Sequence, residues 1–358
     1  MKTFTQPICL LGLGGVGRAL VRLVLATRQR HLARHRLHIA ILAVADSRCW
    51  MYAPAGIPDD TLEHIVVRKT QGLDWADSNG QPLAAVLELL AQWPPHTIVV
   101  DTTASEATVP LLLEAKARGM GVVLANKLPL AGDLRWWDAL ANHTSRWETT
   151  CGAALPVIST LNTLLDSGDE VLCIEGALSG TLAYLCSQLE RGAPFGASVR
   201  HAKQLGYTEP DPRQDLNGLD AARKALILAR MLGYRLELRD VQVESLYPSH
   251  MDALDVDAFL EQADLLNDQM AARAADLTTG GRKLRYAATI SDGQLRVGLV
   301  GVPPESKLGS VHGSDSIVVF HTRYFSDNPL AVSGRGAGQE VTASGVLGDV
   351  VNLSHVMR

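Results

Sequence analysis

A glycine-rich turn near the N-terminus limits the folds open to this chain more than any other feature. The turn matches the pattern GxGxxG and consists of Gly12, Leu13, Gly14, Gly15, Val16 and Gly17. An apolar, strand-like run over residues 8–11 precedes it, and a helical pattern follows. In such a unit the glycines allow a tight turn, close approach of a pyrophosphate, and close packing of helix on strand. We therefore expect a parallel α/β sheet that binds a dinucleotide through these six residues, with a merely tight turn as the alternative.

The remaining sequence divides into two parts of different character. Up to about residue 150, short apolar runs alternate with helical periodicity, which is typical of a parallel α/β sheet. Later, strand-like runs joined by turns occupy residues 285–321. We predict a Rossmann-like nucleotide-binding domain over residues 1–150 with 334–358, and an α+β catalytic and dimerisation domain over residues 151–333. The stretch 49–80 is rich in Pro, Gly and Asp, which indicates a surface excursion.

Composition excludes several functional classes. The net charge of -5 and the pI near 6.1 argue against a nucleic-acid partner, which needs a basic surface. No run approaches the ~18 apolar residues of a membrane span. The N-terminal apolar run is too short for a signal peptide. Five cysteines without CxxC spacing indicate buried free thiols, and so we expect a cytoplasmic protein.

Asp46 and Arg48 follow the second predicted strand and bear on the choice of cofactor. A carboxylate at this position binds the adenosine ribose hydroxyls and favours NAD, whereas an arginine holds the 2′-phosphate of NADP. Because both residues are present, the sequence leaves NAD and NADP open, and we predict that both residues contact the cofactor.

Polar residues also follow two later strands of the predicted parallel sheet. Thr103 comes two residues after the strand that ends at Asp101, and Lys127 comes two residues after the strand that ends at Ala125. The carboxyl ends of parallel strands meet at one edge of the sheet, where ligands bind. We expect both residues at the cofactor and substrate. The alternatives are a helix N-cap for the Thr/Ser turn and a solvated surface lysine.

An acidic segment over residues 206–224 carries the strongest sign of chemistry. Its carboxylates are Glu209, Asp211, Asp215 and Asp220. Pro210 and Pro212 exclude a helix there and stiffen the loop. Asp220 and Lys224 are four residues apart in the following helical pattern, so they share one face. The spacing alone would allow an exposed ion pair worth ~0.3–0.5 kcal/mol. With the acidic loop beside it, we predict a site that moves a proton, as hydride transfer to or from an alcohol requires.

This segment reads GYTEPDP over residues 206–212 and DLNGLDAARK over residues 215–224, which resembles the signature of the homoserine dehydrogenases. Further matches are the glycine turn and the stretches 125–127, 148–156, 176–182 and 336–349. The resemblance covers nearly the whole chain. It implies reversible oxidation of L-homoserine to L-aspartate 4-semialdehyde with NAD or NADP.

The resemblance also implies roles for individual residues. Lys224 would donate or accept the proton at the substrate oxygen. Glu209 and Asp220 would hold the polar groups of the substrate, and Asp215 would support them. Lys127 would lie near the nicotinamide and the substrate. Thr103 and Gly338 would line the cofactor. A monovalent cation, usually sodium, would bind backbone carbonyl oxygens of Glu148, Cys151, Ala153 and Leu155.

Two departures from the family pattern concern the substrate crevice and the chain end. Ala183 replaces the usual Asn of the GTxNY motif, which removes one polar contact. No aspartate kinase half or C-terminal regulatory domain is recognised, so we expect no threonine feedback through such a domain.

A homodimer is expected through the strands near residues 317–321, with a tetramer as the alternative. A nicotinamide-sensing regulator and a related amino-acid semialdehyde oxidoreductase remain the competing functions.

Overall fold

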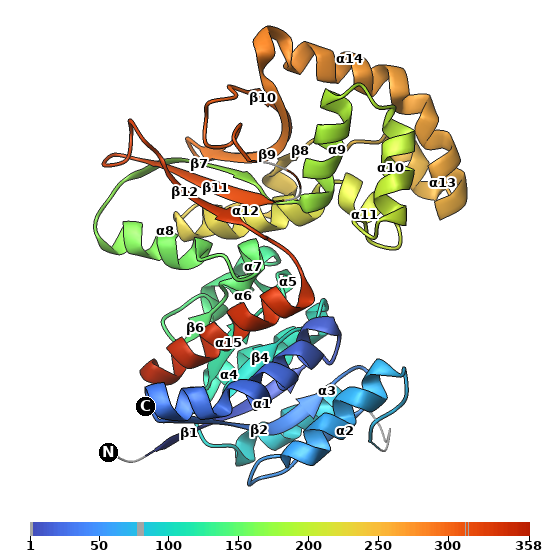
Figure 1. Cartoon of the computed structure of the whole chain (residues 1–358). Helices are drawn as coiled ribbons and strands as arrows, with labels where there is room; N and C mark the ends of the chain where they lie inside the picture. The colour runs from blue at the N-terminus through green and yellow to red at the C-terminus, as the bar shows by residue number, and fades with distance from the viewer. Residues whose placement is uncertain (1–2, 77–81, 312, 314) are drawn as a thin grey trace. The chain divides into compact units, whose positions relative to one another are not determined.

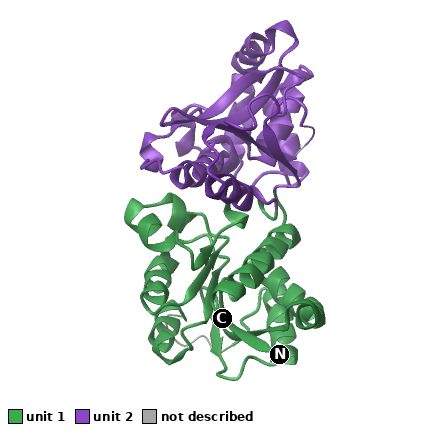
Figure 2. Cartoon of the chain, turned by 90° about the vertical axis from the view of Figure 1, so that its left-hand side faces the viewer, with its two compact units in different colours: residues 1–154, 337–358 green, residues 155–336 purple. Residues whose placement is uncertain are grey.

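The protein folds into two compact units (Figure 2). A computed structural model describes residues 3–76, 82–311, 313 and 315–358 (Figure 1). Unit 1 comprises residues 1–154 and 337–358, and unit 2 comprises residues 155–336.

Unit 1 is built on a six-stranded sheet with the order β3-β2-β1-β4-β5-β6. The strands are β1 (Phe4–Leu11), β2 (Leu37–Ala45), β3 (Trp50–Tyr52), β4 (Ile98–Asp101), β5 (Gly121–Leu124) and β6 (Ser145–Arg146). All neighbouring pairs are parallel except β2 with β3. The central strands are buried along most of their length, because helices cover both faces of a doubly wound sheet. This confirms the predicted Rossmann-like domain class.

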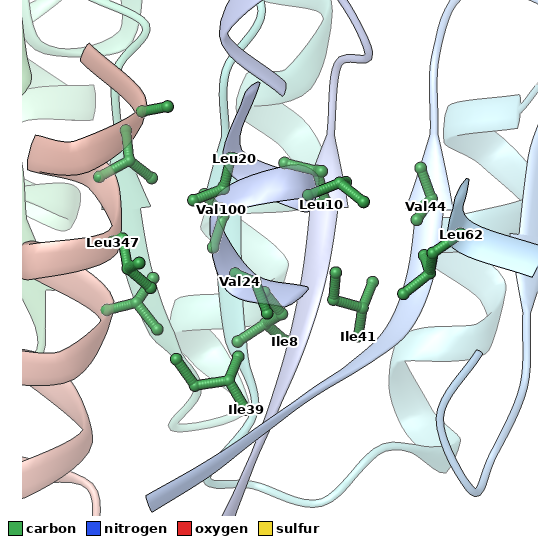
Figure 3. Close-up of a cluster of buried hydrophobic side chains, with 14 of the residues drawn as sticks. Ile8, Leu10, Leu20, Val24, Ile39, Ile41, Val44, Leu62, Val100 and Leu347 are labelled. Atoms are coloured by element: carbon green, nitrogen blue, oxygen red, sulfur yellow. The ribbon is translucent and has the colours of Figure 1, made fainter. Parts of the chain in front are cut away.

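Helices from both ends of the chain close the core of unit 1. They are α1 (Gly15–His35), α2 (Asp59–Thr70), α3 (Pro82–Leu89), α4 (Val109–Ala117), α5 (Leu128–Ala131), α6 (Leu134–Leu140), α7 (Thr149–Gly152) and α15 (Gln339–Val356). The C-terminal α15 runs beside α1 (Figure 1). Its Leu347 joins the same apolar cluster as Ile8 and Val100 (Figure 3).

The interpretation of residues 49–80 as a surface excursion is wrong for most of that stretch. β3 extends the sheet, and α2 buries Leu62, Ile65 and Val66 in the core. Figure 3 shows Leu62 within that cluster. Proline and glycine stand at the turns before α2, whereas its apolar residues have i, i+3, i+4 spacing. Residues 77–80 lie outside the described part of the chain.

Unit 2 combines a mixed sheet with helices, as predicted for the second domain class. The strand order is β12-β11-β7-β9-β10-β8, and only the short β8–β10 pair is parallel among the pairings described. The strands are β7 (Val171–Ala177), β8 (Gln242–Val243), β9 (Lys283–Ser291), β10 (Gln294–Val302), β11 (Ser316–Thr322) and β12 (Leu330–Gly334). The helices are α8 (Val157–Asp166), α9 (Gly180–Glu190), α10 (Phe195–Gln204), α11 (Arg213–Leu216), α12 (Leu219–Met231), α13 (Val256–Gln262) and α14 (Asn267–Leu277).

Helices α9 and α12 pack against β9 and so stand on the sheet of unit 2. All five cysteines are free, and four are buried, whereas Cys173 is half-buried. Among the described residues, no helix has both the length and the apolar character needed to cross a membrane.

Candidate active site

The glycine turn of unit 1 has the geometry that its sequence predicts. Gly12 has a φ of +92°, which favours glycine, and a Cβ there would lie 2.9 Å from Cγ2 of Thr103. A Cβ on Gly17 would overlap the carbonyl oxygen of Gly12, so only glycine lets α1 approach β1 this closely. A Cβ on Gly14 would meet no atom within 4 Å. The turn therefore leaves open space at Gly14.

The N-terminus of α1 is suited to an anion. Gly14 is its N-cap, and no described side chain caps the first turn. The first backbone N–H groups of a helix have no partner within it, and they carry partial positive charge. Together with the open space at Gly14, this arrangement fits a dinucleotide pyrophosphate.

The six residues of the turn do not all face this space. The side chain of Leu13 is buried in the core, and Val16 packs against the same cluster. A Cβ on Gly15 would overlap the side chain of Gln339, at the start of α15. Leu13 and Val16 can therefore offer only backbone groups. Gln339, which the sequence reading missed, lies directly against the turn.

Gly338 precedes Gln339 and forms the N-cap of α15. Its φ of +119° favours glycine, and its carbonyl oxygen accepts hydrogen bonds from the backbone and side chain of Thr342. The contact between Gln339 and Gly15 brings the start of α15 to the glycine turn. The C-terminal segment thus returns to the predicted nucleotide site within unit 1.

A buried network joins the ends of β4 and β5. Asp101 has no exposed surface, and its carboxylate accepts hydrogen bonds from Thr103 N at 2.9 Å, Thr108 Oγ1 at 2.7 Å and Asn126 Nδ2 at 3.0 Å. Burial raises the pKa of Asp101, although these donors oppose the rise. Lys127 follows Asn126 as the N-cap residue of α5. The network therefore holds the backbones of Thr103 and Lys127 at the carboxyl edge of the sheet.

The alternative role of this turn as a helix cap holds for one residue. Ser105 Oγ accepts a hydrogen bond from Ala107 N at the start of a short 3-10 helix. Asn126 Nδ2 also donates to the Ser105 carbonyl oxygen at 2.8 Å. Within this segment, Ser105 thus caps a helix, and its backbone is also held by Asn126 at the carboxyl edge of the sheet.

Asp46, at the end of β2, is only 8% exposed. Its Oδ1 accepts from the backbone N–H groups of Arg48 and Cys49 at 2.7 and 2.8 Å. Its Oδ2 lies 2.9 Å from Trp75 Nε1 and 2.6 Å from Lys69 Nζ. Burial alone would raise the pKa of Asp46, but these four donors outweigh it and lower the pKa. The sequence indicated neither Lys69 nor Trp75 as a partner.

In unit 2, Lys224 lies on α12 beside Asp220. The Lys224 Nζ is 2.8 Å from Asp220 Oδ2 and donates to the carbonyl oxygen of Leu178 at 2.7 Å. The predicted shared helix face is confirmed. The side chain of Lys224 is 13% exposed and that of Asp220 is 43% exposed, so the lysine is too sheltered for an ordinary surface ion pair.

Asp215 connects the acidic loop to α9. Its Oδ2 accepts from Glu209 N at 2.9 Å, and its Oδ1 accepts from Thr181 Oγ1 at 3.0 Å. Burial raises the pKa of Asp215, the two hydrogen bonds lower it, and the charges of Glu209 and Asp220 add to the rise. The three carboxylates are therefore close enough to interact, while the side chain of Glu209 reaches the surface.

Asp211 does not join the carboxylates around Lys224, contrary to the sequence reading. It pairs with Arg213, whose Nη2 lies 2.8 Å from Asp211 Oδ2, and this pairing lowers the pKa of Asp211. Arg213 Nη1 also donates to three backbone carbonyl oxygens, those of Met251, Asp252 and Leu254. Arg213 therefore anchors the acidic loop to the segment before α13.

The chain around Ala183 has aromatic neighbours. Tyr184 Oη lies 2.6 Å from His201 Nδ1, and its ring meets that of Tyr207 edge to face at 5.2 Å between centroids. Tyr207 directly precedes the Thr208-Glu209 part of the acidic loop. Half-buried Ala183 lies one residue before Tyr184 on α9 and has no polar side-chain atom to contribute.

The predicted cation segment has an unusual backbone. Ala153 adopts a φ of +53° and a ψ of -116°, and Cys151 is 1% exposed. Glu148 N donates to Asp349 Oδ2 at 2.9 Å. No cluster of three or more His, Cys, Asp or Glu side chains suited to a metal occurs among the described residues. A cation in this segment would thus depend on backbone oxygens.

Comparison with known proteins agrees with this geometry. The chain matches the homoserine dehydrogenase NAD-binding domain over residues 12–151 and the homoserine dehydrogenase family over residues 156–351. It is 34% identical to a bifunctional aspartokinase/homoserine dehydrogenase of Haemophilus influenzae, over 97% of this chain and 42% of that protein. It thus spans less than half the length of this bifunctional relative.

Two further relatives match over their whole length. A homoserine dehydrogenase of Emericella nidulans is 34% identical, over 98% of this chain and 99% of that protein. A crystal structure of a Candida auris protein of unknown function has a TM-score of 0.83 and 29% identity, with 98% of each chain covered. The family matches and the full-length similarity show that the chain belongs to the homoserine dehydrogenase family.

Proposed function

We propose that the protein catalyses the reversible NAD(P)-dependent interconversion of L-homoserine and L-aspartate 4-semialdehyde. The observation that carries this proposal is the sheltered Lys224, which lies 2.8 Å from Asp220 on one face of α12. Family membership supports the reaction, since both domain models match the chain.

The proton step belongs to Lys224. Oxidation of an alcohol removes a hydride from the carbinol carbon and a proton from its oxygen, and a carbonyl bond forms. When bound, the nicotinamide ring supplies the acceptor or donor of the hydride. Lys224 takes the proton during oxidation and returns it during reduction. Asp220 and the Leu178 carbonyl oxygen hold the amine in place.

The neighbouring carboxylates account for recognition of an amino acid. Glu209 and Asp220 present negative charge to the substrate ammonium group, since both reach the surface. Asp215 acts as a positioning residue, because it accepts hydrogen bonds from the backbone N–H of Glu209 and the hydroxyl group of Thr181. Ala183, where the family has Asn, offers the substrate one polar contact fewer. The two hydrogen bonds of Asp215 do not involve this position.

The groups of unit 1 hold the cofactor. The open glycine turn and the uncapped end of α1 receive the pyrophosphate. By family resemblance, Thr103 and Gly338 would line the bound cofactor, and Lys127 would lie beside the nicotinamide and the substrate. The Asp101 network supports this arrangement, because it holds the loops that carry Thr103 and Lys127.

A monovalent cation, sodium by family resemblance, is proposed on the carbonyl oxygens of Glu148, Cys151, Ala153 and Leu155. The positive φ of Ala153 supports this site, because a non-glycine residue held there is a costly conformation that often marks function. Activity and thermal stability should be higher in sodium chloride than in choline chloride at equal ionic strength. Equal values in both salts would remove the cation from the proposal.

A homodimer through the sheet of unit 2 is also proposed, with a tetramer as the alternative. Glu175 and His321 lie on neighbouring strands, and their side chains are 2.8 Å apart and about one-third exposed. Thr289 pairs with Glu175 on the next strand and is also half-buried. Light scattering after gel filtration gives the mass, and a monomer at micromolar concentration would contradict the proposal.

The test of the main proposal is a spectrophotometric assay with L-homoserine and either NADP or NAD. Reduction of one of them supports the dehydrogenase. A nicotinamide-sensing regulator would bind the reduced cofactor but give no turnover with any substrate. A related semialdehyde oxidoreductase would turn over another amino acid alcohol faster than homoserine, which would point to Ala183 as the cause.

A further inference from the structure

The turn between β2 and β3 has a carboxylate whose bonding capacity is already filled. A carboxylate offers about four acceptor positions, two on each oxygen. Asp46 uses two on Oδ1 for backbone N–H groups and two on Oδ2 for Lys69 and Trp75. No acceptor position of Asp46 is left for a ribose hydroxyl.

This matters because NAD recognition at such a turn depends on that carboxylate. In the dinucleotide-binding fold, an acidic residue here accepts hydrogen bonds from the ribose hydroxyl groups. To do so, Asp46 would have to release Lys69 or Trp75, which are tied to it at 2.6 and 2.9 Å. Lys69 also neutralises the charge that would otherwise repel a phosphate at this position.

Arg48 stands at the same turn with its guanidinium accessible. Its side chain is 53% exposed, and its Nε lies 3.3 Å from Oδ1 of Asp74, which is 46% exposed. Exposed pairs of this kind contribute only ~0–1 kcal/mol, so a phosphate can compete for Arg48. Arg68 donates to the Asp74 carbonyl oxygen at 2.7 Å. The turn and its neighbours thus hold three cations, Arg48, Arg68 and Lys69, and two carboxylates, Asp46 and Asp74.

We infer that this turn selects a dinucleotide with a phosphate on the adenosine ribose, so that NADPH binds more tightly than NADH. Arg48 binds that phosphate. Lys69 and Trp75 act as positioning residues, because they fill the acceptor positions of Asp46 Oδ2 and leave none for the ribose hydroxyl groups. The inference rests on the proposed dinucleotide binding and specifies which cofactor the site takes.

The test is direct binding of NADPH and NADH, measured by the fluorescence of the reduced nicotinamide without substrate. We expect NADPH to bind at least about tenfold more tightly at low ionic strength, with the difference shrinking as salt screens the charges. Arg48→Gln should weaken NADPH binding about tenfold or more and change NADH binding less than about threefold. Equal affinity of the unchanged protein for both cofactors would overturn the inference.

Arg34→Gln is the matched control. It removes the same charge from an exposed position on α1, 20 residues and therefore about 30 Å along the helix from Gly14. It should leave both affinities unchanged. Should Arg48→Gln weaken both cofactors equally, Arg48 would not read the 2′-phosphate, and the inference would fail.

Lys69→Met tests the part assigned to Asp46. It leaves the carboxylate charged with a free acceptor, so NADPH binding should weaken and NADH binding should strengthen. Trp75→Phe, which removes only the indole N–H, should move the ratio in the same direction by less and is less disruptive to folding. An unchanged ratio in a folded Trp75→Phe or Lys69→Met protein would overturn this part. Binding of neither cofactor to the unchanged protein would instead remove the proposed function.

Discussion

Asp46 and Asp101 in unit 1 are 8% and 0% exposed, whereas the side chain of Asp220 in unit 2 is 43% exposed and Glu209 lies at the surface. Donors of the protein itself surround the first two carboxylates. Those donors include backbone N–H groups and side chains from distant parts of the chain. Asp46 and Asp101 therefore hold loops of unit 1 in shape, whereas Glu209 and Asp220 of unit 2 can meet a ligand.

Lys116 and Lys224, each with close polar partners, show a similar contrast. Lys116, on α4, donates to Asn142 Oδ1 at 2.6 Å and Ser145 Oγ at 3.1 Å, and also to Thr144 Oγ1. All three acceptors are neutral and precede or begin β6, at the edge of a parallel sheet opposite to the ligand crevice. Lys224 instead pairs with a carboxylate beside the acidic loop. The chemistry of the partners, neutral for Lys116 and acidic for Lys224, separates the structural lysine from the proposed proton donor.

The largest effect is expected from Lys224→Ala. Loss of the proton-transfer group should lower kcat by ~10²–10⁴. NADPH affinity should stay within about threefold, because the change lies in unit 2. Steady-state kinetics with homoserine give kcat, and Lys283→Ala, an exposed lysine on β9, is the control. A loss below tenfold would transfer the role to Lys127 or to a bound water and would break the contrast between the lysines.

Asp101→Ala tests the structural role of the buried carboxylates. The change leaves Thr103 N, Thr108 Oγ1 and Asn126 Nδ2 without their acceptor, which should cost about 2–4 kcal/mol of unfolding free energy. Urea denaturation followed by circular dichroism measures the loss. Asp60→Ala, an exposed aspartate in the first turn of α2, should cost less than about 1 kcal/mol. Similar losses in the two variants would show that the Asp101 network does not stabilise unit 1.

The smallest effect is a pH dependence due to Lys116. Burial, with a smaller contribution from the charge of Arg146, lowers the pKa of Lys116 to about 8. Above that pH the folded protein loses this proton, but the unfolded chain keeps it up to about pH 10. The unfolded state then binds more protons, so Lys116 favours folding increasingly as pH rises from 8 to about 10.

Lys116→Met isolates this contribution. The Tm of the unchanged protein minus the Tm of the variant should rise by a few degrees from pH 7.5 to pH 10. Activity of the variant at pH 7.5 should stay within about twofold, since Lys116 lies away from the ligand edge. A Tm difference that is independent of pH would show that Lys116 titrates normally.

Local sequence patterns predicted much of the fold and part of the site. The glycine turn, the alternating strands and helices, and the i,i+4 pair of Asp220 and Lys224 depend on residues within one or two turns of each other. Asp211 shows where local reading failed, because its partner Arg213 is only two residues away but also bonds to carbonyl groups about 40 residues later. Spacing alone could not show which of several nearby cations would form an ion pair with Asp211.

The sequence by itself determined the dinucleotide turn, the class of both domains and the acidic loop with its lysine, because backbone conformation and helical spacing are local properties. The tertiary structure decided the state of Asp46, which depends on Lys69 and Trp75 from other elements. It also decided that α15 returns to Gly15 and that Asn126 ties Lys127 to Asp101. These contacts join residues about 20 to more than 300 positions apart. Packing of the core brings them together, and no local pattern records such pairings.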